Sequence, residues 1–563
     1  MRGTKDEDRG SGDSPGWRLG LAGVLVAALV LLATGARWGL PGWQTWAVDA
    51  IHPEQVERAR DRGFSDGWHE RYPPLHFYLL SSVYWTADTI SGGEAPTRQA
   101  ELSRHILLGR WLSLAMTLGS LLLLTCLGHR LFDLGSGVLA AALAATQPPL
   151  VYYAKTTNLE APYLFWLLLA LFFLVRLLDD GRARDAVGLG VAAALAVGTK
   201  DQAYAFFLLA PLPMLWAAGR RDADEARPGS TVAGWWRALR TSRLAWVLAA
   251  GAGVLAAIYL VPGNARGFLA HVELITGDAS QPYRQFAPSP AGYASLFTLV
   301  ARQVGVCLGV GGLVASLAGV ALAWRDRHGD PRIRRTAVAG LLLACLSYEL
   351  FFVGVVGYSF LRFQLPVALV LTLFGGHFLR RLLQPESLGL PGRTARVAGA
   401  TAVAVVLAIG LVRGAMVDLH LLKDGRYLAE EWVAERAAEL EQPVDGALCI
   451  GRRRHCPRLA TVRWDRVLRD PGTFLENHEP SWIAINVDDL RSEAERRFYS
   501  DLTAGTYNYR HVFTATGEVP LPLLPRKPIR SSFRFVNPRI DVFERVDEDA
   551  SDQDPDSHSD GAA

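Results

Sequence analysis

The chain has 563 residues, of which half are hydrophobic and 20% are charged, and its formal net charge is +3. A soluble protein of this length usually carries a larger charged fraction. The apolar residues also form long runs, such as 112–127, 163–178 and 397–412, and a membrane-spanning helix needs roughly 20 mostly apolar residues. These features exclude an ordinary soluble protein and predict a polytopic membrane protein with no nucleic-acid partner.

The chain begins with a hydrophilic tail, residues 1–16, and the first apolar run follows it. No small-residue cleavage site follows this run, so we interpret it as a retained signal anchor. We expect a membrane domain over 17–415 with about eleven spans. The predicted spans are 17–39, 105–128, 135–152, 160–178, 186–199, 202–218, 244–262, 295–323, 336–357, 363–379 and 397–415.

The orientation in the membrane is predicted from arginines in short connections, which gather near 176–184, 220–243, 325–335 and 380–396. Lys and Arg are enriched in cytoplasmic loops. With eleven spans, all four connections lie on the side of the N-terminus, so that side is predicted to be the cytoplasm. The connection 41–104 and the C-terminal segment then lie outside. We expect the protein in the cytoplasmic (inner) membrane of a cell.

The first outer loop, 41–104, contains two groups of candidate residues. Asp49 and His52 occur in the sequence TWAVDAIHPEQ. The second group follows in ERYPPLHFYLL, where a Pro-Pro pair blocks helix continuation. The apolar stretch 75–85 after this pair is too short to cross the bilayer and is expected to lie along the interface. The second group consists of Glu70, Arg71, Tyr72, Pro73 and Pro74.

Further polar residues occur at the predicted outer ends of later spans. They are Lys155, Asn158 and Glu160 before the fourth span, Lys200 after the fifth and Arg362 before the tenth. Charged groups at span ends tend to line a cavity, because facing lipid is costly. A carboxylate there can act as general base on a hydroxyl, and Lys and Arg can hold a phosphate. We expect these residues and the acid of the first outer loop to converge on one outer face.

The C-terminal segment, 416–548, contains no spanning run and is expected to fold as an outer α/β domain. An acidic tail, 549–563, follows it and is expected to be disordered. Cys449 and Cys456 either pair as a disulfide, which an outer location permits, or stay free. The predicted elements of the domain are a helix at 425–440 and strands at 447–450, 482–487, 511–514 and 540–543.

The order of these motifs resembles that of the GT-C glycosyltransferases. More narrowly, the pattern resembles that of the bacterial relatives of the dolichyl-phosphate-mannose protein mannosyltransferases and of the lipid A aminoarabinose transferase. The chain departs from the family pattern at Ala50, where a second acid is usual, and at Tyr72, which separates Arg71 from the prolines. The matching residues are Asp49 in VDAIHP, Tyr72 to Leu75 with Tyr78, Glu160 in NLEAP, Thr199-Lys200, and Arg362 in RFQLP.

The resemblance implies an all-α polytopic membrane bundle of GT-C type, with about eleven transmembrane helices and a small C-terminal α/β domain outside the cytoplasm. It implies inverting transfer of a monosaccharide from a polyprenyl-phosphate donor to a protein, lipid or glycan acceptor. Asp49 would be the general base, and Glu160 would position the acceptor or assist the base. Lys200, Arg362 and Arg71 would bind the donor phosphate. The substrate cavity would contain His52, Glu70, Tyr72, Pro73, Pro74, Lys155 and Asn158.

Other interpretations stay open. An oligosaccharide or O-antigen ligase would use a diphosphate carrier, and a non-catalytic scaffold would only display the C-terminal domain. A transporter or flippase would predict charges deep within the spans and duplicated halves, whereas the ionisable residues here concentrate at the outer rim. Glu160 can instead cap a helix, and Lys200 can extend toward the interface. His52 and Glu70 could hold a divalent metal, but two ligands make a poor site, so no metal is assigned.

Overall fold

A computed structural model shows two compact units, which are described separately below. The first comprises the described residues up to Ala36 together with Asp49–Val417. The second comprises Arg37–Val48 and the described residues from Asp418 onward. The predicted acidic tail, most of the predicted N-terminal tail, Glu70 and Arg71 lie outside the described residues. The structure describes residues 15–64, 72–92, 95–225, 239–260, 265–276, 282–325, 331–520 and 532–546.

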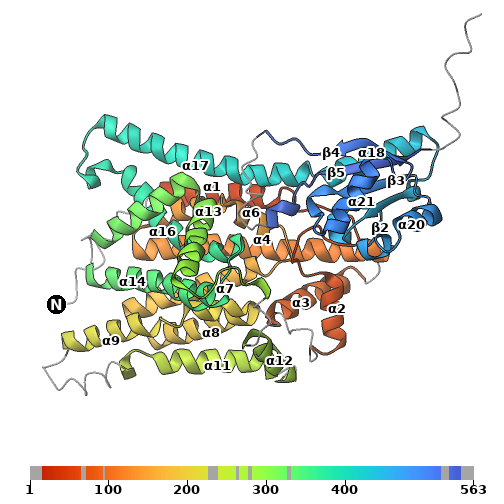
Figure 1. Ribbon diagram of the computed structural model, residues 1–563. Coiled ribbons are helices and arrows are strands. Elements are labelled where there is room, and N and C mark those ends of the chain that lie inside the picture. Colours follow the sequence, from red (N-terminus) through yellow and green to blue (C-terminus); the bar gives the residue numbers. More distant parts are fainter. Residues whose placement is uncertain are drawn as a thin grey trace, which may run out of the picture. The chain divides into compact units, whose positions relative to one another are not determined.

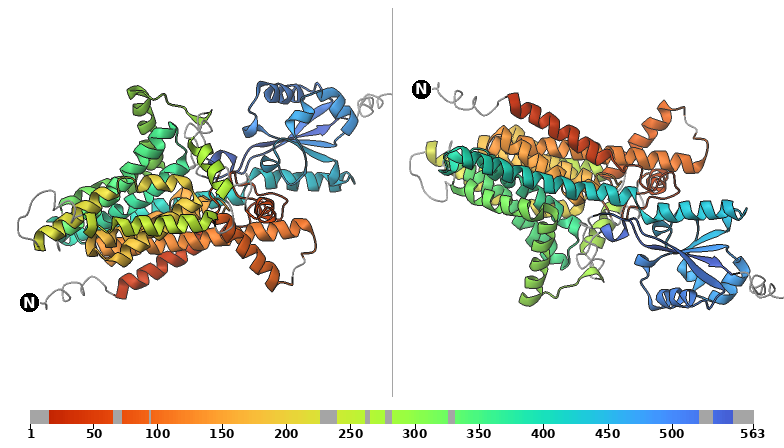
Figure 2. Two further views of the ribbon diagram at one scale, coloured as in Figure 1. Left: turned by 90° about the horizontal axis from the view of Figure 1, so that it is seen from below. Right: turned by 90° about the horizontal axis from the view of Figure 1, so that it is seen from above.

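The first unit is a helical bundle in which the predicted spans can be followed one by one (Figures 1 and 2). Eight helices of the described part are long and apolar enough to cross a membrane, and α5 and α11 are shorter apolar helices. The remaining predicted span corresponds to α8. The bundle helices are α1 (Pro15–Ala33), α4 (Arg98–Leu131), α5 (Leu134–Ala145), α7 (Glu160–Asp180), α8 (Ala183–Thr199), α9 (Pro211–Glu225), α11 (Leu244–Leu260), α13 (Pro290–Arg325), α14 (Pro331–Tyr348), α16 (Leu365–Leu382) and α17 (Arg393–Leu422).

Local sequence signals set the ends of these helices. The Thr97 hydroxyl accepts a hydrogen bond from the Ala100 N–H at 3.2 Å and caps α4, and the Asp133 carboxylate caps α5 in the same way. Such side chains satisfy N–H groups that the first helical turn leaves unpaired. At the other end, α7 stops at Gly181, whose φ of 65° ends the helix.

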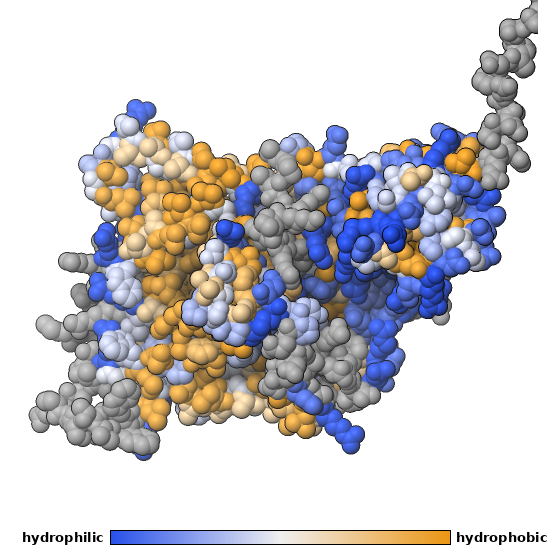
Figure 3. Space-filling model, in the orientation of Figure 1, coloured by the Kyte–Doolittle hydropathy of each residue, from blue (hydrophilic) through white to orange (hydrophobic). Residues whose placement is uncertain are grey.

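Apolar side chains cover the outside of the bundle as well as its interior. A broad hydrophobic band crosses the helices in Figure 3, and side chains such as Leu248 and Val397 are more than half exposed. A helix that is apolar on all sides is stable where lipid replaces water. Close helix contacts depend on small residues, since a Cβ at Gly376 of α16 would overlap the backbone of α5. The first unit therefore belongs to a multi-pass membrane protein.

Among the predicted spans that are interrupted, two have a local cause in the sequence. The predicted span 135–152 is divided between α5 and α6 (Pro148–Tyr153), because two consecutive prolines follow Gln147 and cannot continue the hydrogen bonding of α5. The predicted span 295–323 is one apolar run, but α13 has a break at Gly309, where φ is 71° and ψ is 165°. A glycine adopts this left-handed conformation without the penalty of a Cβ.

Short helices occupy the predicted first outer loop. They are α2 (Pro53–Asp61) and α3 (Leu75–Ile90), and α3 begins directly after the Pro-Pro pair, so the predicted apolar segment 75–85 is helical. Phe77 and Leu80 of α3 pack against Val56 of α2 in a small apolar core. Burial of these side chains holds the two helices together.

The second unit is the predicted small α/β domain. Its five-stranded sheet has the order β2-β1-β3-β5-β4, with parallel pairing of β1 to β2 and β3, and antiparallel pairing of β5 to β3 and β4. Sequence analysis missed β2. The strands are β1 (Ala447–Ile450), β2 (Ala460–Val462), β3 (Trp482–Asn486), β4 (Tyr509–Ala515) and β5 (Ile540–Arg545), and the larger helices are α18 (Gly425–Glu439), α20 (Pro471–His478) and α21 (Glu493–Thr503).

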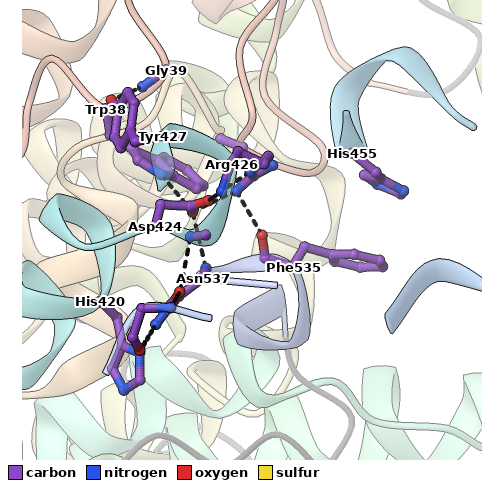
Figure 4. Close-up of polar contacts among 12 residues, drawn as sticks. Trp38, Gly39, His420, Asp424, Arg426, Tyr427, His455, Phe535 and Asn537 are labelled. Carbon is purple, nitrogen blue, oxygen red and sulfur yellow. Dashed lines mark hydrogen bonds and ion pairs between the residues drawn. The ribbon is translucent and has the colours of Figure 1, made fainter. Parts of the chain in front are cut away.

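The segment Arg37–Val48 packs into this second unit (Figure 4). Asp424 caps α18 and forms a buried ion pair with Arg426 at 2.7 Å, and both side chains are fully buried. The Trp38 indole donates a hydrogen bond to the Asp424 carboxylate at 3.0 Å, and the Arg426 guanidinium lies 4.1 Å from the Trp46 ring centroid. Charge-assisted and cation–π contacts therefore connect the end of the predicted first span and the start of the predicted first outer loop to the C-terminal domain.

Candidate functional site

Asp49 lies in a backbone loop that is fixed to the segment before α7. Its φ is 63°, a left-handed conformation that Asp adopts more readily than most residues. The Asn158 amide donates to the Asp49 carbonyl at 3.3 Å. The Thr157 hydroxyl donates to the Ile51 carbonyl at 2.7 Å, and the Ile51 N–H donates to the Thr157 carbonyl at 3.2 Å. These bonds bring two segments that are far apart in the sequence to one place.

Glu160 is the first residue of α7 and is almost fully buried, with 1% of its surface exposed. Its N–H donates to the Asn158 side-chain oxygen at 3.1 Å, so one amide contacts both acidic positions. The Glu160 carboxylate accepts a hydrogen bond from the Lys200 ammonium at 2.5 Å. Lys200 follows the last residue of α8 and is 7% exposed. This is a buried ion pair between the ends of two adjacent helices.

Arg362 connects the two acids. It lies in the short 3-10 helix η5 (Leu361–Gln364), directly before α16. Its guanidinium forms an ion pair with the Asp49 carboxylate, and its Nε lies 3.4 Å from Glu160 Oε1. Asp49, Arg362, Glu160 and Lys200 are thus joined in one chain of contacts, hereafter the acid–base cluster. Its two negative and two positive charges balance, which makes burial of these groups tolerable.

Tyr72 lies within the electrostatic reach of this cluster. Burial raises the pKa of Tyr72 to about 12, the Arg362 guanidinium opposes this rise, and the Asp49 and Glu160 carboxylates add to it. The phenol is therefore protonated at neutral pH and is available as a hydrogen-bond donor. Pro73 and Pro74 are buried beside it, and Pro74 is the N-cap of α3.

For two other predicted site residues, the described contacts are with groups outside the acid–base cluster. His52 is the N-cap of α2, where its Nδ1 accepts from the Glu54 N–H at 3.3 Å. The Lys155 ammonium is buried and donates to the carbonyls of Leu31 at 2.8 Å and Val151 at 3.2 Å. Lys155 therefore satisfies carbonyls at the ends of α1 and α6.

Aromatic rings around the two cations were not predicted. Phe360 and Phe363 lie 5.2 and 5.8 Å from the Arg362 guanidinium, and Phe363 and Tyr163 each lie 5.6 Å from the Lys200 ammonium. Such rings stabilise a desolvated cation. The aromatic residues that flank the arginine in YSFLRFQLP were the available signal.

A possible metal-binding group lies outside the acid–base cluster. Glu57, Glu101 and His105 place ligand atoms within 4.8 Å of one another. Arg98 forms ion pairs with both of these carboxylates, and His105 Nε2 lies 3.0 Å from the Asp88 carboxylate. The two glutamates are thus paired with Arg98 and the histidine contacts Asp88, so we assign no metal to these residues.

The acid–base cluster combines three chemical capabilities in one place. A partly exposed carboxylate can accept a proton from a hydroxyl. The guanidinium can bind a phosphate with two parallel hydrogen bonds, and the ammonium can add a point charge. Surrounding apolar and aromatic groups lower the local dielectric and strengthen these interactions.

Residues 102–227 match the family model of the dolichyl-phosphate-mannose-protein mannosyltransferases. This match confirms, over that part of the chain, the resemblance predicted from the motifs. No curated protein sequence matches the chain.

Solved structures with similarity to the chain include three membrane proteins. ArnT from Cupriavidus metallidurans bound to undecaprenyl phosphate is 14% identical, with a TM-score of 0.45 and coverage of 94% of this chain and 98% of that chain. AglB from Archaeoglobus fulgidus, an archaeal oligosaccharyltransferase, is 14% identical, with a TM-score of 0.44 and coverage of 90% and 76%. The S. cerevisiae protein O-mannosyltransferase complex Pmt1–Pmt2 is 16% identical, with a TM-score of 0.34 and coverage of 49% of this chain and 36% of that chain.

Proposed function

We propose that this chain, a relative of the GT-C glycosyltransferases, transfers a monosaccharide from a polyprenyl-phosphate donor to an acceptor hydroxyl. The reaction would take place at the outer face of the cytoplasmic membrane. One observation carries the proposal: two acids and two cations contact one another where α7 and η5 begin and α8 ends. The family match over residues 102–227 supports the same class of reaction.

Asp49 is the proposed general base. Its side chain is 37% exposed, whereas that of Glu160 is 2% exposed, so Asp49 is the acid that an acceptor can reach. The acceptor oxygen attacks the anomeric carbon while its proton passes to the Asp49 carboxylate. The bond from that carbon to the phosphate oxygen breaks, and the phosphate leaves with the electron pair. Attack opposite to the leaving group inverts the anomeric configuration.

Arg362 and Lys200 are the proposed phosphate-binding groups. Arg362 forms an ion pair with Asp49, so a donor phosphate that binds the same guanidinium would compete with Asp49. Its arrival would release the carboxylate at the moment when a base is needed. Glu160 contacts both cations, which supports a positioning role for it rather than direct proton transfer.

The donor class distinguishes this proposal from the alternatives. Membranes that contain the full chain are incubated with labelled polyprenyl-phosphate monosaccharides or with polyprenyl-diphosphate oligosaccharides, and labelled products are separated from the donors. We expect transfer from the monophosphate donors, loss of transfer in Asp49→Asn, and retention in Asp61→Asn, a matched change at an exposed acid of the same loop.

Two outcomes contradict the proposal. Transfer from the diphosphate donor alone identifies an oligosaccharide ligase. Movement of labelled lipid across the membrane without formation of a product identifies a transporter or flippase.

A further inference from the structure

A cleft opens where α13 is broken, between that break, α17 and the junction of α5 with α6. None of its residues belongs to the acid–base cluster. Its polar lining includes Gln147 and Arg413, and most of the other lining residues are apolar or glycine. The lining residues are Leu143, Thr146, Gln147, Cys307, Leu308, Gly309, Val310, Gly311, Gly312, Val406, Ile409, Gly410 and Arg413.

Arg413 places a positive charge in this cleft from α17. Its guanidinium donates a hydrogen bond to the Val306 carbonyl, three residues before the break in α13. A Cβ at Gly309 would overlap the same guanidinium, so the glycine creates the space that the arginine occupies. Within the described part of the chain, no carboxylate forms an ion pair with Arg413. A cation in a membrane domain without a counter-charge is costly and marks a functional position.

Gln147 provides a second, independent indication of a ligand. Its side chain lines the cleft and is 2% exposed, and neither its amide nitrogen nor its amide oxygen has a hydrogen-bond partner among the described residues. Buried amides are nearly always hydrogen-bonded. The free amide N–H₂ group and the guanidinium are therefore two donor groups that line one cleft.

The mouth of the cleft is apolar. Val310 is 82% exposed and Ile409 is 56% exposed, on helices that belong to the predicted membrane spans. A ligand reaches such a mouth from the lipid phase.

We propose that this cleft binds the phosphate group of an anionic lipid. The Arg413 guanidinium would bind the phosphate oxygens, the Gln147 amide would donate a further hydrogen bond, and the acyl or prenyl chains would lie along the apolar mouth. Either a phospholipid or the polyprenyl phosphate carrier presents this chemistry, and the experiment below distinguishes these two sources. The inference does not depend on the proposed glycosyl transfer.

The test measures lipid binding to the purified, delipidated full chain in detergent by native mass spectrometry. The probes are dioleoyl phosphatidylglycerol, polyprenyl phosphate and, as a neutral control, dioleoyl phosphatidylcholine. We expect saturable binding of one anionic lipid, at least tenfold weaker in Arg413→Met and largely kept in Arg413→Lys. The matched control, Arg393→Met, removes an exposed arginine near the other end of α17 and should bind as the intact chain does.

A second pair of variants keeps the test decisive if Arg413→Met does not fold. Gln147→Glu introduces a carboxylate that would pair with the arginine and exclude the phosphate, so anionic lipid binding should be lost. Gln147→Leu removes only one donor and should weaken binding less. The anionic lipid whose binding is weakened in Arg413→Met identifies the source of the phosphate, because polyprenyl phosphate held at Arg362 and Lys200 would bind this variant unchanged. Equal binding of phosphatidylcholine, or an equal loss in Arg393→Met, would overturn the proposal.

Discussion

Glu160 is the side chain on which the charge balance of the site depends. It contacts Lys200 and Arg362 and is 1% exposed, so removing its charge leaves a buried ammonium without its partner. Loss of one member of a buried ion pair costs about 3 kcal/mol or more. We therefore expect Glu160→Gln to lower the free energy of unfolding by about 3 kcal/mol, measured by thermal unfolding in detergent.

Two further variants separate the effect of losing the buried ion pair from the effect of replacing a carboxylate with an amide. Asp49→Asn changes a more exposed acid and should destabilise the protein less than Glu160→Gln does. The double variant Glu160→Gln/Lys200→Met removes both charges and should be more stable than Glu160→Gln alone. Equal stability of all three variants would show that the pairing of Glu160 with Lys200 contributes nothing.

Tyr72 gives a prediction about pH. Because burial raises its pKa from 10.0 to about 12, the folded protein keeps the phenol proton at pH values where the unfolded chain releases it. Its contribution to stability is full below pH 10 and falls as the pH rises through 12. We expect Tyr72→Phe to leave the shape of the pH–rate profile between pH 6 and pH 9 unchanged. A new or missing inflection in that range would contradict the assignment.

The sequence allowed the convergence of Asp49, Glu160, Lys200 and Arg362 to be predicted, because charged residues are rare at span ends and a topology with eleven spans places all four on one side. Their pairing could not be predicted, since it depends on side-chain directions at the ends of separate helices. His52 has a local role that its sequence context explains: a residue directly before Pro53 and Glu54 is well placed to cap a helix. Its place in the substrate cavity stays a prediction.

At the scale of elements, Gly309 is the position where α13 changes direction. Its φ of 71° and the adjacent Arg413 guanidinium both exclude a Cβ. We expect Gly309→Ala to destabilise the protein by about 1–3 kcal/mol, the cost of a backbone conformation that is essentially restricted to glycine. Thermal unfolding measures this change.

Gly305 is the matched control on the same helix. A Cβ there meets only the Leu313 side chain at 3.7 Å, an ordinary contact, so Gly305→Ala should be neutral or slightly stabilising. If both alanine variants behave alike, the break at Gly309 is not required. The break was not predictable, because the sequence LGVGGLV is part of one continuous apolar run and only the packing of Arg413 distinguishes its glycines.

The disulfide between Cys449 and Cys456 connects β1 to the turn that follows it. Closing a loop of this size stabilises a fold by roughly 2 kcal/mol in the chain-entropy model. We expect reduction to lower the unfolding temperature of the second unit, whereas Cys126→Ser, which changes a thiol outside the disulfide, should not. An intact bond in protein isolated under thiol-blocking conditions is also expected if this domain lies outside the cytoplasm.

At the scale of the whole molecule, the sequence predicted the membrane bundle and the α/β domain better than it predicted the boundary between the two units. Long apolar runs define membrane helices by length alone, and alternating helix and strand patterns predicted the C-terminal α/β domain. Segment 37–48 was expected to belong to the membrane domain. Its grouping with the second unit depends on contacts of Trp38 and Trp46 with residues almost 400 positions later, which no local pattern predicts.

The central claim is that Asp49 performs chemistry while Arg362 binds the donor phosphate. It is tested most directly by measuring, for Asp49→Asn, both transfer and the affinity for a polyprenyl-phosphate sugar. Asparagine tolerates the left-handed backbone at this position and leaves Arg362 without its competing carboxylate. The account predicts that transfer falls at least a hundredfold while donor binding stays the same or becomes tighter. Transfer at the original rate, or loss of donor binding together with transfer, would contradict it.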